Sequence, residues 1–146
     1  MEFVEFYTKL FGTHYPTTGL DPSIVTSGNI LPLDAVEGLV TPITDLEIKE
    51  ALFDIGDNKA PGPDGYTSAF FKHNWHLVGH EFILAVKGFF GSGKLLKQLN
   101  HTLIALIPKT THSPTASDFR PISCTNVIYK VITKILAKRL IPCLPN

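Results

Sequence analysis

Two basic side chains flank a short polar loop, and together they have the chemistry to bind phosphate. Lys109 follows the apolar run of residues 101–108, and Arg120 opens the run of residues 120–123. Short apolar runs with polar or proline boundaries predict strands. If the two strands pair, an ammonium and a guanidinium project near one hairpin. This pair suits a triphosphate or a backbone phosphate, because lysine offers a point charge and arginine a two-pronged donor.

A second group of cations lies on the longest helix that the sequence predicts, residues 125–141. At about 100° per residue, Lys130, Lys134 and Lys138 share one face of that helix. The apolar residues of the helix lie roughly opposite: Ile128, Val131, Ile132, Ile135 and Leu136. A row of lysines suits phosphate contacts along a nucleic-acid backbone, although an ordinary solvated helix face has the same pattern. Arg139 falls within the apolar arc, so it must reach solvent, pair with an acid or contact a ligand.

A mostly helical chain must position these cations. Thr44 and Glu47 have the spacing of a capping box, which predicts a helix that ends at Gly56. Residues 12–44 hold four prolines and four glycines and predict a loop region or linker. The other helices that we expect cover residues 2–11, 67–77 and 80–90, with a break at Gly79. The predicted fold class is α+β, mostly helical with one small antiparallel hairpin.

The charge of the 146-residue chain is zero overall but is strongly divided along the sequence. Residues 1–57 carry ten acidic and two basic side chains, whereas residues 58–146 carry three acidic and eleven basic ones. The two parts therefore have net charges of −8 and +8. A basic second half suggests an anionic partner such as nucleic acid. The alternative is that the two halves pair with each other.

Composition narrows the class of protein further. Two cysteines, Cys124 and Cys143, are too few for a disulfide framework. The acidic, aromatic N-terminus does not resemble a secretory signal, and the longest apolar runs are far too short for a membrane span. We therefore expect a soluble intracellular chain without a membrane partner. It starts within one helical pattern and stops just after another, which we interpret as a piece of a larger protein.

Two further patterns indicate structure more than chemistry. Residues 88–95 fit a phosphate loop except that Leu95 stands where Ser or Thr must bind Mg²⁺, and a helical pattern precedes them. His73, His76 and His80 have helical spacing, but zinc needs a fourth ligand and supporting groups around it. We interpret the first pattern as a glycine-terminated helix and the second as solvated or partly buried histidines.

Three blocks of sequence, in order, resemble a known family. They are NKAPGPDGYTSAFFKHNW, LLKQLNHTLIALIPK, and DFRPIS followed by NVIYKVITKILAKRL. Together they resemble the N-terminal part of the reverse transcriptase domain of LINE-type, non-LTR retrotransposons, as found in plant genomes. The resemblance covers residues 57–146, a partial polymerase domain. Residues 1–56 look like the variable lead-in that precedes such a domain.

The resemblance implies a right-hand polymerase fold, of which these blocks form part of the fingers. It places the loop formed by Gly62, Pro63, Asp64 and Gly65 near the template. It also implies that the Ile-Pro-Lys and Arg-Pro-Ile-Ser blocks flank the hairpin that covers the incoming nucleotide. Lys109 and Arg120 are then the candidates for its phosphates. The implied partners are RNA or an RNA–DNA hybrid, and the palm region of the polymerase.

The catalytic residues of the family have no counterpart in this sequence. Two-metal polymerisation needs carboxylates, yet no acid follows Asp118 and no Asp-Asp pair occurs. We therefore expect no catalytic or metal-binding residue and no cofactor in this chain, with Mg²⁺ needed only by a complete polymerase. The leading hypothesis is a truncated reverse transcriptase fragment that is inactive alone. The alternatives are part of a longer functional polymerase, a non-catalytic RNA-binding module, or an expressed relic without a selected function.

Overall fold

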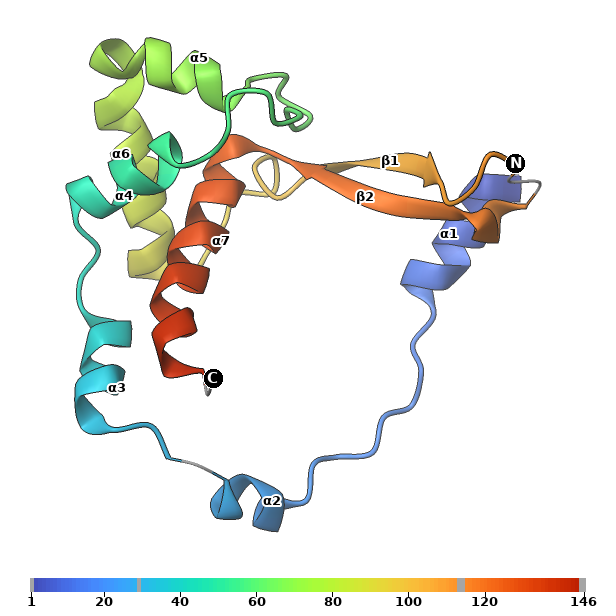
Figure 1. Ribbon diagram of the computed structural model, residues 1–146, viewed down its shortest axis with the longest axis horizontal. Coiled ribbons are helices and arrows are strands. Elements are labelled where there is room, and N and C mark those ends of the chain that lie inside the picture. The colour runs from blue at the N-terminus through green and yellow to red at the C-terminus, as the bar shows by residue number, and fades with distance from the viewer. Residues whose placement is uncertain (1, 29, 113–114, 145–146) are drawn as a thin grey trace. The chain divides into compact units, whose positions relative to one another are not determined.

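The computed structural model describes residues 2–28, 30–112 and 115–144, which combine helices with one two-stranded sheet (Figure 1). The helices are α1 (Glu2–Gly12), α2 (Pro22–Ser27), α3 (Leu33–Val40), α4 (Asp45–Phe53), α5 (Ser68–His73), α6 (Trp75–Ser92) and α7 (Val127–Leu140). The strands are β1 (Thr102–Pro108) and β2 (Phe119–Thr125), and short 3₁₀ helices cover Ala116–Asp118 and Ile141–Cys143. The predicted α+β class, with its single hairpin, is confirmed.

The chain divides into two compact units. The smaller unit comprises the residues up to Ile30 together with Leu106–Ile122, and the larger unit comprises Leu31–Ala105 and the residues from Ser123 onward. The larger unit contains α3 to α7, and the smaller unit contains α1 and α2. The boundary predicted from the sequence, between residues 56 and 57, concerns regions of a polyprotein and stays a prediction.

Three helices, α4, α6 and α7, form the core of the larger unit (Figure 1). The hydroxyl of Thr44 accepts a hydrogen bond from the Glu47 backbone N–H at 3.1 Å, as the predicted cap requires. The buried residues are Ile48, Ala51, Leu52, Ile55, Phe82, Val86, Val127, Val131, Ile132 and Ile135. Burial of each large apolar side chain contributes roughly 1.5–3 kcal/mol. This core fixes the helix that carries the lysine row.

The break between α5 and α6 lies at Asn74, so the predicted break at Gly79 is wrong. The Asn74 side chain donates to the Phe70 carbonyl at 2.8 Å and competes with helix continuation. Gly79 lies inside α6, where an added Cβ would stand 2.8 Å from Cε2 of Trp75. This glycine therefore makes room for the indole ring and does not end a helix.

In the smaller unit, α1 packs on the 3₁₀ helix Ala116–Asp118. The Tyr7 hydroxyl donates to the Ala116 carbonyl at 3.2 Å, and Tyr7 is buried. The ring of Phe3 meets that of Phe119 edge-on, with centroids 5.2 Å apart. These contacts position the residues that lead into β2.

The proline- and glycine-rich region, residues 12–44, is not entirely loop. It contains α2 and α3. The Asp21 carboxylate accepts from the Ser23 backbone N–H at 2.9 Å, and Pro22 occupies the first helical position. An aspartate cap followed by proline is a standard helix start, so the prediction of a plain linker is wrong for these residues.

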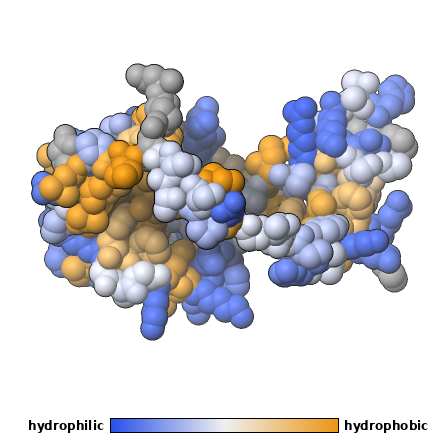
Figure 2. All heavy atoms as spheres, turned by 90° about the horizontal axis from the view of Figure 1, so that it is seen from below, coloured by the Kyte–Doolittle hydropathy of each residue, from blue (hydrophilic) through white to orange (hydrophobic). Residues whose placement is uncertain are grey.

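Many large apolar side chains of the described residues are exposed, as the face drawn in Figure 2 illustrates. On the hairpin these include Leu103, Ile104, Ile107 and Ile122. A two-stranded hairpin is at best marginally stable by itself in water. Within the described residues, no helix combines the length and apolar character needed to cross a membrane.

Candidate nucleic-acid interface

The Gly62–Gly65 loop is a tight turn whose side chains hold its own backbone. The Gly65 N–H donates to the Gly62 carbonyl at 3.1 Å, with Pro63 and Asp64 at the two central positions. Gly65 has a φ of 77°, a backbone conformation that residues other than glycine rarely adopt. The Asp64 carboxylate accepts from the Tyr66 N–H at 3.0 Å. The loop predicted to lie near the template is therefore a hydrogen-bonded turn.

Gly62 packs directly against Asn126, at the start of α7. A Cβ on Gly62 would lie 2.2 Å from Oδ1 of Asn126, a distance at which something must shift. Oδ1 accepts from the Asp64 N–H at 3.3 Å, while Nδ2 donates to the carbonyls of Gln98 and Leu99 at 3.2 and 3.3 Å. Asn126, which is 1% exposed, thus joins the loop, the segment before β1 and the start of α7.

Sequence reasoning did not select Asn126. An asparagine directly before a long helical pattern is a helix-start signal, and that signal was available. In the structure, however, its side chain makes no cap hydrogen bond with α7. Its contacts run to residues far away in sequence, which one-dimensional spacing does not reveal.

The three lysines of α7 all donate to groups within the larger unit. Lys130 Nζ donates to the Ala60 carbonyl. Lys134 Nζ lies 2.8 Å from the Asp54 carboxylate and 3.2 Å from the Asp54 carbonyl. Lys138 Nζ lies 3.4 Å from the same carboxylate. The two ammonium groups lower the pKa of Asp54, chiefly through the hydrogen bond from Lys134.

These lysines belong to a set of side chains that hold the backbone after α4. The carbonyl of Ile55 accepts from Lys72, whose ammonium also pairs with the Asp57 carboxylate at 2.6 Å. The Gly56 carbonyl accepts from the buried Ser68 hydroxyl at 2.9 Å. Carbonyls at and beyond a helix C-terminus lack helical partners, and here side chains from α5 and α7 supply them.

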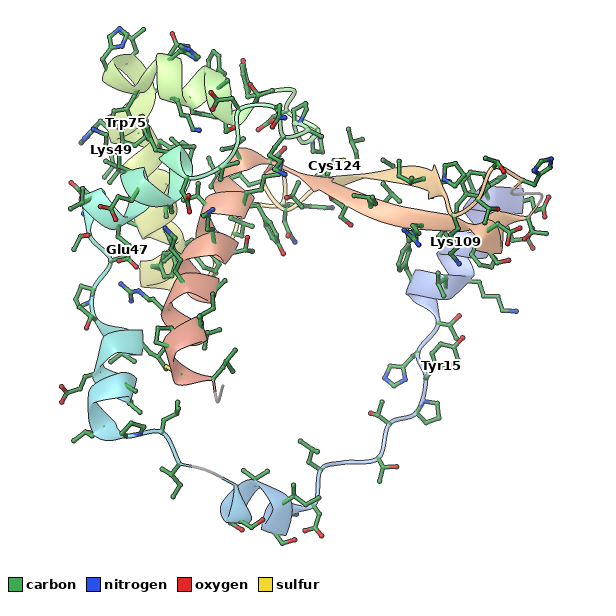
Figure 3. All side chains as sticks on the ribbon, in the orientation of Figure 1. Tyr15, Glu47, Lys49, Trp75, Lys109 and Cys124 are labelled. Atoms are coloured by element: carbon green, nitrogen blue, oxygen red, sulfur yellow. The ribbon has the colours of Figure 1, made fainter. Side chains whose placement is uncertain are left out.

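Arg139 pairs with an acid, which settles the alternatives that its position on the helix leaves open. Its Nε and Nη2 each lie 2.8 Å from a Glu47 carboxylate oxygen, and its Nη1 donates to the carbonyls of Leu39 and Thr41. The bidentate bond with Arg139 lowers the pKa of Glu47, and the same bond raises the pKa of Arg139. This side chain joins α7 to α4 (Glu47 is labelled in Figure 3) and to the end of α3.

The ion pairs of the described residues join the acidic first part of the chain to the basic second part. They are Lys72–Asp57, Lys87–Asp45, Lys134–Asp54, Lys138–Asp54 and Arg139–Glu47. Within the larger unit, acidic side chains of the first part of the sequence therefore pair with basic side chains of the second part. Exposed pairs contribute little each, and the better buried Arg139–Glu47 pair is the one expected to matter for stability.

At the other end of the hairpin, Lys109 and Arg120 differ in their surroundings. The Lys109 N–H donates to the Asp118 carbonyl at 2.8 Å, and its Nζ donates to the Ser117 carbonyl at 2.7 Å. Lys109 is labelled in Figure 3. The Arg120 side chain is exposed and makes no hydrogen bond or ion pair with any part of the chain that the structure describes. Residues 113–114 of the predicted loop lie outside the described residues.

The carboxylate of Asp118, close in sequence to Lys109 and Arg120, accepts hydrogen bonds from Thr115. It accepts from the Thr115 N–H at 3.1 Å and from the Thr115 hydroxyl at 2.8 Å. These hydrogen bonds lower the pKa of Asp118, and the charge of Lys109 adds a smaller effect. The acid is thus tied to the loop, which leaves the Arg120 guanidinium without a carboxylate partner in the described chain.

The predicted histidine spacing spans two helices in the structure. His73 ends α5, whereas His76 and His80 lie on α6. His73 Nδ1 lies 2.7 Å from the Ala69 carbonyl. Across residues 2–28, 30–112 and 115–144, no group of three or more His, Cys, Asp or Glu side chains is arranged to hold a metal ion.

No known protein-family profile matches the chain. It is 34% identical over 104 residues to the transposon TX1 uncharacterized 149 kDa protein of Xenopus laevis. The aligned residues make up 71% of this chain and 8% of that protein. It is 29% identical over 113 residues to the retrovirus-related Pol polyprotein from type-1 retrotransposable element R2 of Bradysia coprophila, covering 77% of this chain and 12% of the polyprotein.

A further relative is the Pol polyprotein from type-2 retrotransposable element R2DM of Drosophila melanogaster, 28% identical over 115 residues, or 78% of this chain and 10% of that protein. The chain thus spans about a tenth of the length of the curated relatives it matches. These matches support the resemblance found from the sequence blocks. The chain is therefore related to a short segment of retrotransposon-encoded Pol polyproteins.

Proposed function

We propose that the chain is part of the fingers of an RNA-directed DNA polymerase from a LINE-type retrotransposon, of the kind found in plant genomes. The observation that carries this proposal is the order of the three sequence blocks in a chain related to retrotransposon Pol polyproteins. In this role the chain binds RNA or an RNA–DNA hybrid and does not catalyse polymerisation alone.

The hairpin supports a role in binding phosphate. Pairing of β1 with β2 brings Lys109 and Arg120 to the same end of the hairpin. Arg120 is exposed there and keeps its guanidinium donors available. A guanidinium that can bond two oxygens of one phosphate, beside an ammonium, is suited to the triphosphate of an incoming nucleotide.

The lysine row, Lys130, Lys134 and Lys138, supports contact with an RNA backbone, and its members differ in how available their ammonium groups are. Lys138 has 47% of its side chain exposed and the longer of the two contacts with Asp54, whereas Lys134 has 30% exposed. Lys138 is therefore the member of the row that can turn to a phosphate at the lowest cost. We assign the Gly62–Gly65 loop and this end of the row to template or backbone contact.

The palm region is the proposed protein partner. Leu103 and Ile104 of β1, both in the larger unit, are 55% and 45% exposed. Exposed apolar surface of this kind is typical of an interaction site. Paired carboxylates that could hold two metals would come from that partner, because no acid follows Asp118 in this sequence.

Two assays on the purified chain test the proposal. We expect binding to a short unstructured RNA at low salt and no template-dependent primer extension with Mg²⁺ or Mn²⁺. Primer extension above that of a heat-inactivated sample would contradict the assignment as a fragment that is inactive alone. Absence of RNA binding at low salt would favour the relic hypothesis. A third outcome would favour the non-catalytic RNA-binding module. In that outcome the chain binds RNA, but substitution of Arg120 in a polymerase that includes the palm leaves the affinity for the incoming nucleotide unchanged.

A further inference from the structure

Two exposed aromatic rings follow the Gly62–Gly65 loop. Tyr66 is 48% exposed, and Phe70, in the first turn of α5, is 38% exposed. Their ring centroids lie 4.5 Å apart, with 36° between the ring planes. Aromatic rings that remain accessible beside basic residues are the means by which many proteins stack on unpaired bases.

The backbone of Tyr66 is held in place before any ligand binds. Its N–H donates to the Asp64 carboxylate at 3.0 Å, directly after the left-handed Gly65. The ring of Phe71 lies edge-on at 6.0 Å from that of Tyr66, and Phe70 lies on α5. A ring presented from a preorganised turn loses little conformational entropy on binding.

Lys97, a cation without a partner among the described residues, directly precedes Gln98, whose carbonyl is joined to the same loop through Asn126. Lys97 is exposed, and its ammonium has no hydrogen bond or ion pair among residues 2–28, 30–112 and 115–144. The Asn126 side chain contacts both the Asp64 N–H and the Gln98 carbonyl, so it brings the backbone next to Lys97 to the loop that presents Tyr66. The sequence has no acid between Glu81 and Asp118, and the Asp64 carboxylate of the loop itself accepts from the Tyr66 N–H.

We propose that Tyr66, backed by Phe70, stacks on an unpaired RNA base while Lys97 contacts a neighbouring phosphate. The assignment rests on the proposed function and specifies single-stranded RNA as the ligand of this surface. Stacking tolerates any base, because every base has a π-face, so the surface follows the strand without reading its sequence.

The test compares Tyr66→Leu with Tyr66→Phe, by fluorescence anisotropy with a labelled, unstructured RNA oligonucleotide. We expect Tyr66→Leu to weaken binding roughly 5- to 150-fold, the range that stacking of one base supplies. Tyr66→Phe keeps the ring and should bind like the parent. Circular dichroism checks that both variants are folded. Tyr15→Leu is the matched control, because Tyr15 is also exposed (65%) but lies between α1 and α2 (Figure 3).

RNA with abasic positions separates stacking from charge. The parent should bind abasic RNA as weakly as Tyr66→Leu binds intact RNA. Tyr66→Leu should bind abasic RNA almost as tightly as it binds intact RNA. Lys97→Gln should reduce the salt dependence by a slope of up to ~0.7, the value for one single-strand contact. Lys49→Gln is its charge-matched control, because Lys49 lies over the ring of Phe53 on α4.

Each outcome decides between the two proposals. If the parent binds RNA and Tyr66→Leu binds as tightly as Tyr66→Phe, the stacking assignment is overturned and the proposed function stands. If Tyr15→Leu loses as much affinity as Tyr66→Leu, the assignment to this surface is likewise overturned. If the parent binds no RNA at low salt, the proposed function and the stacking surface fall together.

Discussion

One face of α7 and the far end of the hairpin both carry cations that suit phosphate, but these cations have different partners in the chain. Lys130, Lys134 and Lys138 contact a carbonyl or a carboxylate within the larger unit. In the smaller unit, Lys109 contacts a carbonyl of its own loop, and Arg120 has no partner within the described residues. Residue type and spacing are therefore insufficient to distinguish a cation that supports the fold from one that is available to a ligand.

The difference follows from where backbone carbonyls need donors. The segment after α4 turns away from its helix and exposes carbonyls that α7 can reach, so lysines on α7 stabilise it. At the end of the hairpin, Lys109 already donates to the carbonyls of Asp118 and Ser117, and the Arg120 side chain has no partner among the described residues. Variants that remove donors or crowd the contacts should therefore affect the first region far more than the second.

The largest effect is expected from Gly62→Ala. The new methyl group would lie 2.2 Å from Oδ1 of Asn126, so the loop or α7 must move. Overpacking of this kind typically costs about 1–3 kcal/mol, and sometimes more. Urea unfolding measures it, with Gly88→Ala as control, because a Cβ there meets no atom within 4 Å. Equal stability of Gly62→Ala and the parent would show that the loop does not pack on α7 in this way.

A smaller loss is expected when the Arg139–Glu47 pair is broken. Arg139→Lys keeps the charge but loses the two parallel hydrogen bonds to Glu47, for a cost of about 2 kcal/mol. A double-mutant cycle with Glu47→Gln measures the coupling between them. Additive effects of the two substitutions would mean that the pair does not join α7 to α4 in solution.

Acid should destabilise the chain through the same groups. The pKa of Glu47 is lowered by its bond with Arg139, and those of Asp54 and Asp57 by lysine hydrogen bonds. The unfolded chain therefore takes up protons first as pH falls, which favours unfolding. The contribution of these carboxylates to the free energy of unfolding should be fully present above about pH 5 and should decline below the usual carboxyl pKa of roughly 4. Glu47→Gln should flatten this decline, and an unchanged pH profile would contradict the assignment.

Lys134→Gln and Arg120→Gln compare the two regions directly. The first removes donors to the Asp54 carbonyl and carboxylate, so the midpoint of urea unfolding should fall, by less than in Arg139→Lys. The second changes an exposed side chain without a described partner, so the midpoint should stay within error. A larger stability loss for Arg120→Gln would reverse the comparison.

Within the lysine row, the smallest effect on stability is expected from Lys138→Gln. Its ammonium is 3.4 Å from Asp54 and nearly half exposed, so unfolding should change little. RNA binding should instead lose salt dependence, by a slope of up to ~0.7. If affinity and slope are unchanged, Lys138 is only a solvated position on α7.

Local sequence signals predicted the elements well where apolar spacing was clear. Ile48, Ala51 and Leu52 are buried as their helical spacing indicates, and β1 lies within one residue of its predicted start. On α7, Val131 and Ile135 are buried too. The predicted apolar face is too wide by one position, since Leu136 is 40% exposed.

The contacts that the sequence did not reveal depend on long-range packing. The break at Asn74 results from a side chain that competes with the backbone, and Gly79 is needed beside Trp75. The partners of Asn126 and Lys134 are 27 or more residues away in sequence. Spacing along one helix places a side chain on a face but does not say which carbonyl or carboxylate will meet that face.

The most direct test of the account is a salt titration of RNA affinity with the intact chain. In the proposed role, cations of the second half of the chain bind the phosphate backbone. Affinity for a short unstructured RNA should therefore fall as salt rises, with a log–log slope of about 0.7 for each phosphate contact. No binding at low salt, or binding whose strength does not change with salt, would contradict it.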